Sequence, residues 1–227
     1  MSTPISATTR ARFGASIVAI APAVMLAGLL AHPYIATLPD ETAVAATATA
    51  DTTRWGLAHL TVGLASGLVV LAFLAIRSYL REAGEERWSI LALPFIVMGS
   101  TLFALLPGME FAPLAAAEAG ADVEAVQAAL ASWFLPILVT GAVTFAFGVF
   151  VFAKGIAHSR ILSRRLSRLV VGALVVMALA RLVPVGAVQF YVQGVAGIVA
   201  LWPLAYEMWK HPEAARPAGQ PRPMPAA

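Results

Sequence analysis

Residues 55–77 read WGLAHLTVGLASGLVVLAFLAIR, and this stretch decides the fold class. His59 is its only ionisable side chain before Arg77. A helix needs about 20 mostly apolar residues to cross the hydrocarbon core of a bilayer. The stretch is therefore predicted to be a membrane-spanning helix rather than part of a water-soluble core.

Five further stretches of the same kind fill most of the chain. Hydrophobic residues make up 60% of the sequence and charged residues 12%, whereas soluble domains are about 25% charged. The sequence predicts an all-α bundle of six transmembrane helices over 13–209, between a tail at 1–12 and a Pro- and Ala-rich tail at 210–227 that we expect to be disordered. The predicted spans are 13–32, 55–77, 88–107, 133–153, 168–185 and 187–209.

The basic residues predict the orientation, because cytoplasmic loops of membrane proteins are enriched in Lys and Arg. A cytoplasmic N-terminus places 13 basic residues inside and leaves only Arg54 in the outer loops. We therefore predict a multi-pass plasma-membrane protein with both termini in the cytoplasm. A cleaved signal peptide at 13–31 is the alternative, but its small-residue site, Ala19-Ile20-Ala21, falls in the middle of the apolar run. The inner basic residues are Arg10, Arg12, Arg77, Arg81, Arg87, Lys154, Arg160, Arg164, Arg165, Arg168, Lys210, Arg216 and Arg222.

The two longer outer loops differ in their predicted structure. Residues 33–54 consist largely of Thr and Ala around Pro39-Asp40-Glu41, and we expect a mobile cap with little structure. Residues 114–119 are predicted to form a short helix that stops at Gly120. Asp122 can then cap a helix that continues without a break into the fourth span.

Small residues indicate where helices pack. Gly63 and Gly67 form a Gly-xxx-Gly pair, which allows close approach of two membrane helices, and Gly194 and Gly197 give the sixth span a similar face. The second and fourth spans also align from Trp55 and Trp133, as if three helical hairpins repeated. The alternative is that leucine, glycine and tryptophan simply recur in membrane helices.

Polar residues gather at one predicted depth, the outer end of the bundle. Such residues are costly in a membrane and often functional, so we predict an outward-facing ligand pocket in which Arg181 pairs with Glu110. Each residue also has a structural explanation: Arg181 can reach the outer headgroups, and the glutamines can bond neighbouring helices. The candidate ligand-binding residues are His32, His59, Glu110, Arg181, Gln189, Tyr191 and Gln193.

The chain lacks cysteine, which excludes disulfides and thiolate metal sites. It carries no nucleophile elbow or phosphate-binding glycine loop. We therefore predict a non-enzymatic membrane protein, of bacterial origin by its alanine-rich composition. It would bind a small apolar or amphipathic molecule or serve as an accessory subunit of a larger membrane assembly. Its expected partners are lipids and other membrane subunits, with no nucleic acid.

Two alternative functions stay open from the sequence. His32 and His59 lie at similar depth on adjacent helices and could hold haem or a metal ion in a redox protein. No cofactor is otherwise indicated. A small-solute transporter, with Arg181 as an anion contact, is the second alternative.

Overall fold

The fold is entirely helical in the part of the chain that the structure, a computed structural model, describes: residues 7–212. About 85% of the protein is helix. The predicted tails at 1–12 and 210–227 lie partly outside these residues, so the expectation of a disordered C-terminal tail stays a prediction. The helices are α1 (Ala7–Ala31), α2 (Glu41–Ala50), α3 (Thr52–Glu82), α4 (Arg87–Met109), α5 (Phe111–Glu118), α6 (Val123–Ser159), α7 (Arg164–Ala180), the π-helix η1 (Val188–Val192) and α8 (Gln193–Lys210).

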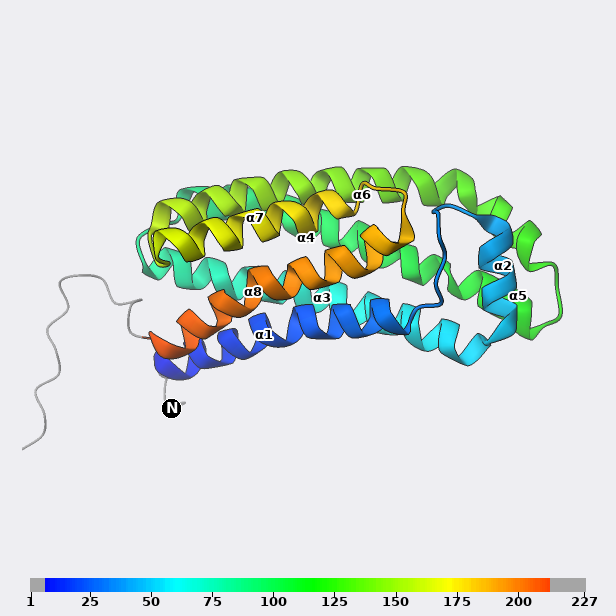
Figure 1. Ribbon diagram of the computed structural model, residues 1–227, viewed down its shortest axis with the longest axis horizontal. Coiled ribbons are helices and arrows are strands. Elements are labelled where there is room, and N and C mark those ends of the chain that lie inside the picture. Colours follow the sequence, from blue (N-terminus) through cyan, green and yellow to red (C-terminus); the bar gives the residue numbers. More distant parts are fainter. Residues whose placement is uncertain (1–6, 213–227) are drawn as a thin grey trace, which may run out of the picture.

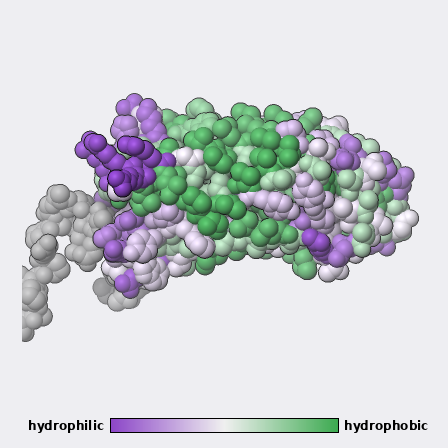
Figure 2. Space-filling view, viewed as in Figure 1, coloured by the Kyte–Doolittle hydropathy of each residue, from purple (hydrophilic) through white to green (hydrophobic). Residues whose placement is uncertain are grey.

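Six long helices form a closed ring of neighbours along the long axis of the molecule (Figure 1). In the order α1, α3, α4, α6, α7 and α8, each packs against the next, and α8 packs back against α1. The short helices α2 and α5 lie across one end, called here the capped end. At the opposite end, called the basic end, α1 begins and α8 ends (Figure 1). Figure 2 shows an apolar band between the two polar ends.

Five helical segments are long and apolar enough to cross a membrane: Thr8–Ala31, Thr52–Glu82, Arg87–Glu118, Val123–Ser159 and Val188–Lys210. The predicted fifth span, 168–185, differs from the structure, because α7 ends at Ala180 after 17 residues. The chain then turns through 181–187. Here the backbone N–H of Gly186 donates to Ala36 O at 2.9 Å, and Thr37 pairs with Val185. The loop after α1 thus holds this turn in place.

Glycine sets the tight contact between α4 and α6. A Cβ atom on Gly99 would lie 2.5 Å from the backbone nitrogen of Phe145, and one on Gly148 would lie 2.8 Å from that of Ile96. Real Cβ atoms do not approach other atoms so closely, so only glycine permits this helix spacing. Beside the seam, the ring of Phe73 packs edge-on against Phe152, with centroids 4.9 Å apart.

The expectation of a mobile, unstructured loop at 33–54 is wrong, because residues 41–50 form α2. Asp40 caps this helix: its Oδ1 accepts a hydrogen bond from Ala43 N at 2.9 Å. The hydroxyl of Thr42 donates to Glu124 Oε1 at 2.8 Å and ties α2 to α6. Alanine is the best helix former, and a capping aspartate stabilises the first turn. These two effects explain the helix.

The predicted course of residues 108–153 is largely confirmed. The short helix α5 begins at Phe111, three residues before the predicted start, and the chain leaves it through Gly120 with φ of +67°. Asp122 caps α6 by accepting a hydrogen bond from Ala125 N at 3.0 Å. The 37 residues of α6 correspond to a length of about 55 Å. This helix therefore extends well beyond a bilayer core of about 30 Å.

The glycines singled out in the sequence have different surroundings. A Cβ on Gly194 would lie 2.7 Å from Leu26 Cδ1, and Gly197 faces Met177 and Pro22, so α8 packs closely against α1 and α7. At Gly67, by contrast, none of the described residues comes within 4 Å of such a Cβ, and Gly63 approaches only Pro107. Within the described part of the chain, the Gly63–Gly67 face of α3 therefore makes no close contact beyond the one with Pro107.

Candidate functional site

The seven candidate residues all lie at or near the capped end, and all but Tyr191 are buried. They form separate groups rather than the single crevice expected from the sequence. One group is a histidine pair, the second surrounds Arg181, and the third surrounds Glu110. Tyr191 stands apart from them and stacks on Tyr34, with ring centroids 6.3 Å apart.

His32 and His59 form a buried pair, called here the histidine pair. His32 follows the last residue of α1, and His59 lies in the second turn of α3. Their Nε2 atoms are 3.2 Å apart. The Nδ1 of His32 lies 2.6 Å from Pro33 O, and the Nδ1 of His59 lies 2.7 Å from Trp55 O. Burial lowers the pKa of His32, and its hydrogen bond to Pro33 only partly offsets this effect.

Aromatic rings enclose the histidine pair. The Trp55 ring centroid lies 4.4 Å from that of His59, and the Phe190 centroid lies 4.7 Å from that of His32. Trp55 is itself fully buried, and its Nε1 donates to the backbone oxygen of Glu110 at 3.2 Å. Trp55 thus connects the histidine pair to the junction between α4 and α5.

Arg181 points into the bundle, so the alternative structural explanation, in which it reaches the outer headgroups, is wrong. Its side chain is 3% exposed, and its guanidinium carbon lies 3.7 Å from the ring centroid of Phe145 and 4.1 Å from that of Phe103. Both positions are typical of cation–π contacts. Its Nη1 is buried and makes no hydrogen bond with the described residues.

The two glutamines surround Arg181. The Nε of Arg181 donates to the side-chain oxygen of Gln193 at 3.3 Å when that amide is oriented to satisfy both of its partners. The amide nitrogen of Gln193 then donates to Gln189 O at 3.0 Å. Gln189 Nε2 donates in turn to Arg181 O at 3.3 Å. These bonds join the end of α7 to the start of α8 and explain why the chain turns here.

The predicted ion pair between Arg181 and Glu110 does not form. The described residues contain two salt bridges, Arg77–Glu86 and Glu207–His211, and both are at the basic end. Glu110 instead accepts a hydrogen bond from Gln127 Nε2 at 3.1 Å. The prediction failed because α7 ends early, which directs Arg181 inward between the two phenylalanine rings.

Glu110 lines a pocket of about 230 Å³ between α2, α6 and the α4–α5 junction, called here the Glu110 pocket. The Glu110 side chain is 6% exposed, and its Oε2 is buried without a hydrogen-bond partner in the described residues. Gln127, which the sequence analysis did not select, is buried beside it. In the sequence, Gln127 stands out only as an uncharged polar residue in the second turn after the cap of α6. The lining residues are Leu38, Pro39, Asp40, Glu41, Val44, Glu110, Gln127, Leu130, Ala131, Phe134 and Leu135.

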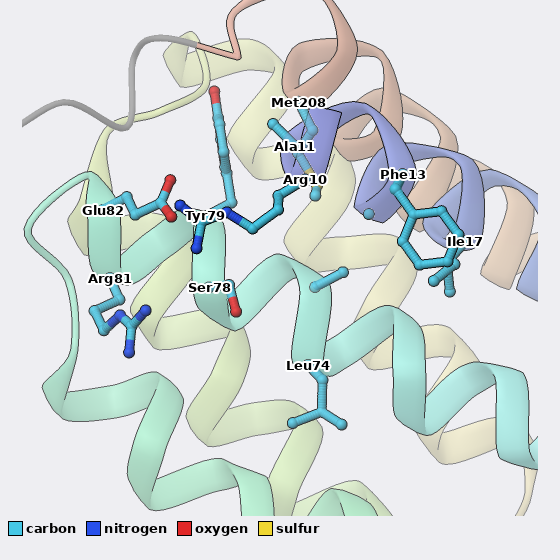
Figure 3. A pocket seen from close by; sticks show the side chains of 12 residues that line it. Arg10, Ala11, Phe13, Ile17, Leu74, Ser78, Tyr79, Arg81, Glu82 and Met208 are labelled. Atoms are coloured by element: carbon cyan, nitrogen blue, oxygen red, sulfur yellow. The ribbon is translucent and has the colours of Figure 1, made fainter. Parts of the chain in front are cut away.

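A second hollow, of about 300 Å³, lies at the basic end between the start of α1 and the end of α3 (Figure 3). Arg10 and Glu82 point toward each other across it, and Phe13 and Ile17 form an apolar wall from α1 (Figure 3). Arg10 and Arg81 are exposed.

Comparison with known protein families, curated proteins and solved structures finds no match to this chain. The geometry defines a class only: a helical bundle with several helices apolar enough for a membrane. The described residues contain no group of three or more His, Asp or Glu side chains placed to hold a metal ion. The function therefore has to be inferred from the buried polar groups at the capped end.

Proposed function

We propose that this chain crosses the plasma membrane six times, with both termini in the cytoplasm and the capped end outside. The short helix α7 makes one of these crossings, because it lies alongside α6 and α8 in the ring (Figure 1). An even number of crossings agrees with the start of α1 and the end of α8 lying together. The excess of exposed arginine at that end supports its cytoplasmic position.

We further propose that the capped end binds a small amphipathic molecule in the Glu110 pocket, and that binding rather than catalysis is the function. One observation carries this proposal: Glu110 Oε2 is buried in the pocket and has no hydrogen-bond partner among residues 7–212. An unsatisfied buried oxygen costs about 1–3 kcal/mol, and more when the group is charged. A ligand that donates a hydrogen bond to this oxygen recovers that free energy.

The pocket lining favours a ligand with a cationic or hydrogen-bond-donating head and a short apolar body. Besides Glu110, the acidic residues Asp40 and Glu41 line the pocket, and among the described residues its lining includes no basic one. The remaining walls are mostly apolar and include Leu130, Phe134 and Leu135. A pocket of about 230 Å³ is below the usual range of about 300–1,000 Å³ for drug-sized ligands. The ligand is therefore small, and an alkylamine is the simplest compound of this class.

The test compares hexylamine, hexanol and hexanoate as probes, which share an apolar body and differ in the head group. Their binding to the full chain in nanodiscs is measured by calorimetry, with empty nanodiscs subtracted to remove membrane partitioning. We expect hexylamine to bind most tightly and hexanoate least tightly. Glu110→Gln should weaken hexylamine binding about 10- to 100-fold, the loss expected for a hydrogen bond to a charged group.

A matched control separates this effect from general charge. Glu118 is exposed on α5 and does not line the pocket, so Glu118→Gln should leave hexylamine binding unchanged. The Glu110→Gln variant keeps an oxygen that can accept from Gln127, so we expect it to fold. The proposal would be contradicted if the three probes bound equally tightly, or if Glu110→Gln left the affinity for hexylamine unchanged.

A further inference from the structure

The hydrogen bonds of the histidine pair fix the tautomers of both rings. A backbone carbonyl oxygen can only accept, so the Nδ1 of His32 facing Pro33 O and the Nδ1 of His59 facing Trp55 O must both carry hydrogen. In a neutral imidazole the other nitrogen then carries a lone pair. Both Nε2 atoms are therefore acceptors, and they face each other at 3.2 Å.

Two facing lone pairs repel each other unless a proton or a metal ion lies between them. The 3.2 Å separation of the Nε2 atoms suits a metal ion. With metal–imidazole bonds of about 2.0–2.1 Å, it corresponds to a nitrogen–metal–nitrogen angle of about 100°, close to tetrahedral. Two axial ligands of a haem iron would instead lie about 4 Å apart, on opposite sides of the iron. This arrangement therefore does not fit a haem held between the two rings.

The surroundings of the pair are those of metal-binding histidines. Such histidines almost always donate their second ring N–H to a carbonyl or carboxylate, which fixes the ring and makes the ligating nitrogen more basic. Both members of the pair do so. His32 also directly follows the C-terminus of α1, where the helix dipole favours a positive charge. Arg54 opposes a cation here, but it is exposed, and its Nε donates to Ala31 O at 2.7 Å.

We propose that the histidine pair binds a divalent first-row transition metal ion of the zinc or copper kind through the two Nε2 atoms. Imidazole nitrogen is a preferred ligand of these ions. The described residues offer no third histidine or carboxylate at this place, so water or a small exogenous ligand completes the coordination. This proposal concerns a different group of residues from the Glu110 pocket, and neither depends on the other.

The test uses the full chain without an affinity tag, because a polyhistidine tag would itself bind metal. Metal-depleted protein is titrated with Zn²⁺ and Cu²⁺, and bound metal is counted by elemental analysis. Co²⁺ serves as a spectroscopic probe of tetrahedral nitrogen coordination. We expect one ion per chain, and at least about 100-fold weaker binding in His32→Ala and in His59→Ala, since even second-shell losses cost 10- to 100-fold.

His158 provides the control, because it is exposed at the basic end. His158→Ala should bind metal like the wild type. Two results would overturn the proposal. In one, the wild-type chain takes up none of the three ions. In the other, the His32→Ala, His59→Ala double variant takes up metal as the wild type does. The wild-type titration can overturn the proposal without any variant, so the test remains valid even if a histidine variant fails to fold.

Discussion

The two ends of this bundle differ in how they hold basic residues. At the basic end, Arg10, Arg81 and Lys154 are exposed. A carboxylate is buried there as well: Glu85 Oε1 accepts from Trp88 N at 2.7 Å, and its Oε2 has no partner among the described residues. At the capped end, Arg181 and Glu110 are buried, and each keeps one polar atom without a partner in the described residues. Figure 2 shows hydrophilic side chains at both ends of the molecule, with the deepest purple at the left, the end where α1 begins.

In the proposed function, the exposed charges of the basic end orient the protein and Glu110 contacts the ligand. An exposed basic residue loses little solvation and needs only the membrane surface to favour one orientation. A buried, incompletely paired charge costs several kcal/mol, and in the proposed function a ligand in the Glu110 pocket recovers part of that cost. The following variants test whether the two ends differ as described.

The largest expected effect lies midway between the ends, at the seam of α4 and α6. Gly99→Leu places side-chain atoms where the Phe145 backbone now lies, and the two helices must separate. We expect a loss of more than about 3 kcal/mol of stability, at the upper end of overpacking effects. It is measured as loss of the monodisperse peak in size-exclusion chromatography and a lower melting temperature in detergent.

The matched control is Gly67→Leu, because none of the described residues approaches a Cβ there. This variant should fold like the wild type. If Gly67→Leu instead disrupts a complex isolated from native membranes, the Gly63–Gly67 face contacts another chain, and the role of accessory subunit gains support. A Gly99→Leu protein as stable as the wild type would mean that the seam is looser than the structure indicates.

The second effect tests the capped end alone through its two tryptophans. Trp55 is 1% exposed and Trp133 is 69% exposed, although the sequence aligned them as equivalent positions of a repeat. Trp55→Ala should destabilise the protein by about 3–5 kcal/mol, as expected for a buried tryptophan. Trp133→Ala should change stability by less than about 0.5 kcal/mol. Thermal unfolding, followed by the fluorescence of the remaining tryptophans, measures both effects. Equal decreases in melting temperature would support Trp55 and Trp133 as equivalent positions of a repeat.

Patterns within one helix could be read directly from the sequence. Apolar runs located the long helices, and Asp122 marked the start of α6 because an aspartate before a helix bonds its own first turn. These are local effects, which depend on residues only a few positions apart. The helix at 41–50 was missed because a polar Thr- and Ala-rich composition resembles disorder, although alanine and the Asp40 cap favour a helix.

Contacts between helices could not be read in the same way. On α6 the seam is set by Gly148 and by Gly141, whose Cβ would lie 3.0 Å from Leu102 Cβ, and these two glycines recur at a spacing of seven. The sequence instead suggested the Gly63–Gly67 pair, and Gly67 has no described residue within 4 Å of a Cβ. The direction of the Arg181 side chain depends on where α7 ends. The rings that it contacts, Phe103 and Phe145, belong to two other helices. Such contacts follow from the order of helices around the ring, which the sequence does not state.

The smallest expected effect compares one helix cap at each end. Asp40 Oδ1 bonds Ala43 N at 2.9 Å at the capped end, whereas Ser163 Oγ bonds Leu166 N at 3.4 Å at the basic end. Asp40→Ala should destabilise α2 by about 1 kcal/mol and speed amide hydrogen exchange over 42–50 about fivefold. Ser163→Ala should change exchange at the start of α7 by less, because its hydrogen bond is longer. If both variants change exchange equally, or if the α2 amides exchange freely in the wild type, α2 is not the fixed wall that the Glu110 pocket requires.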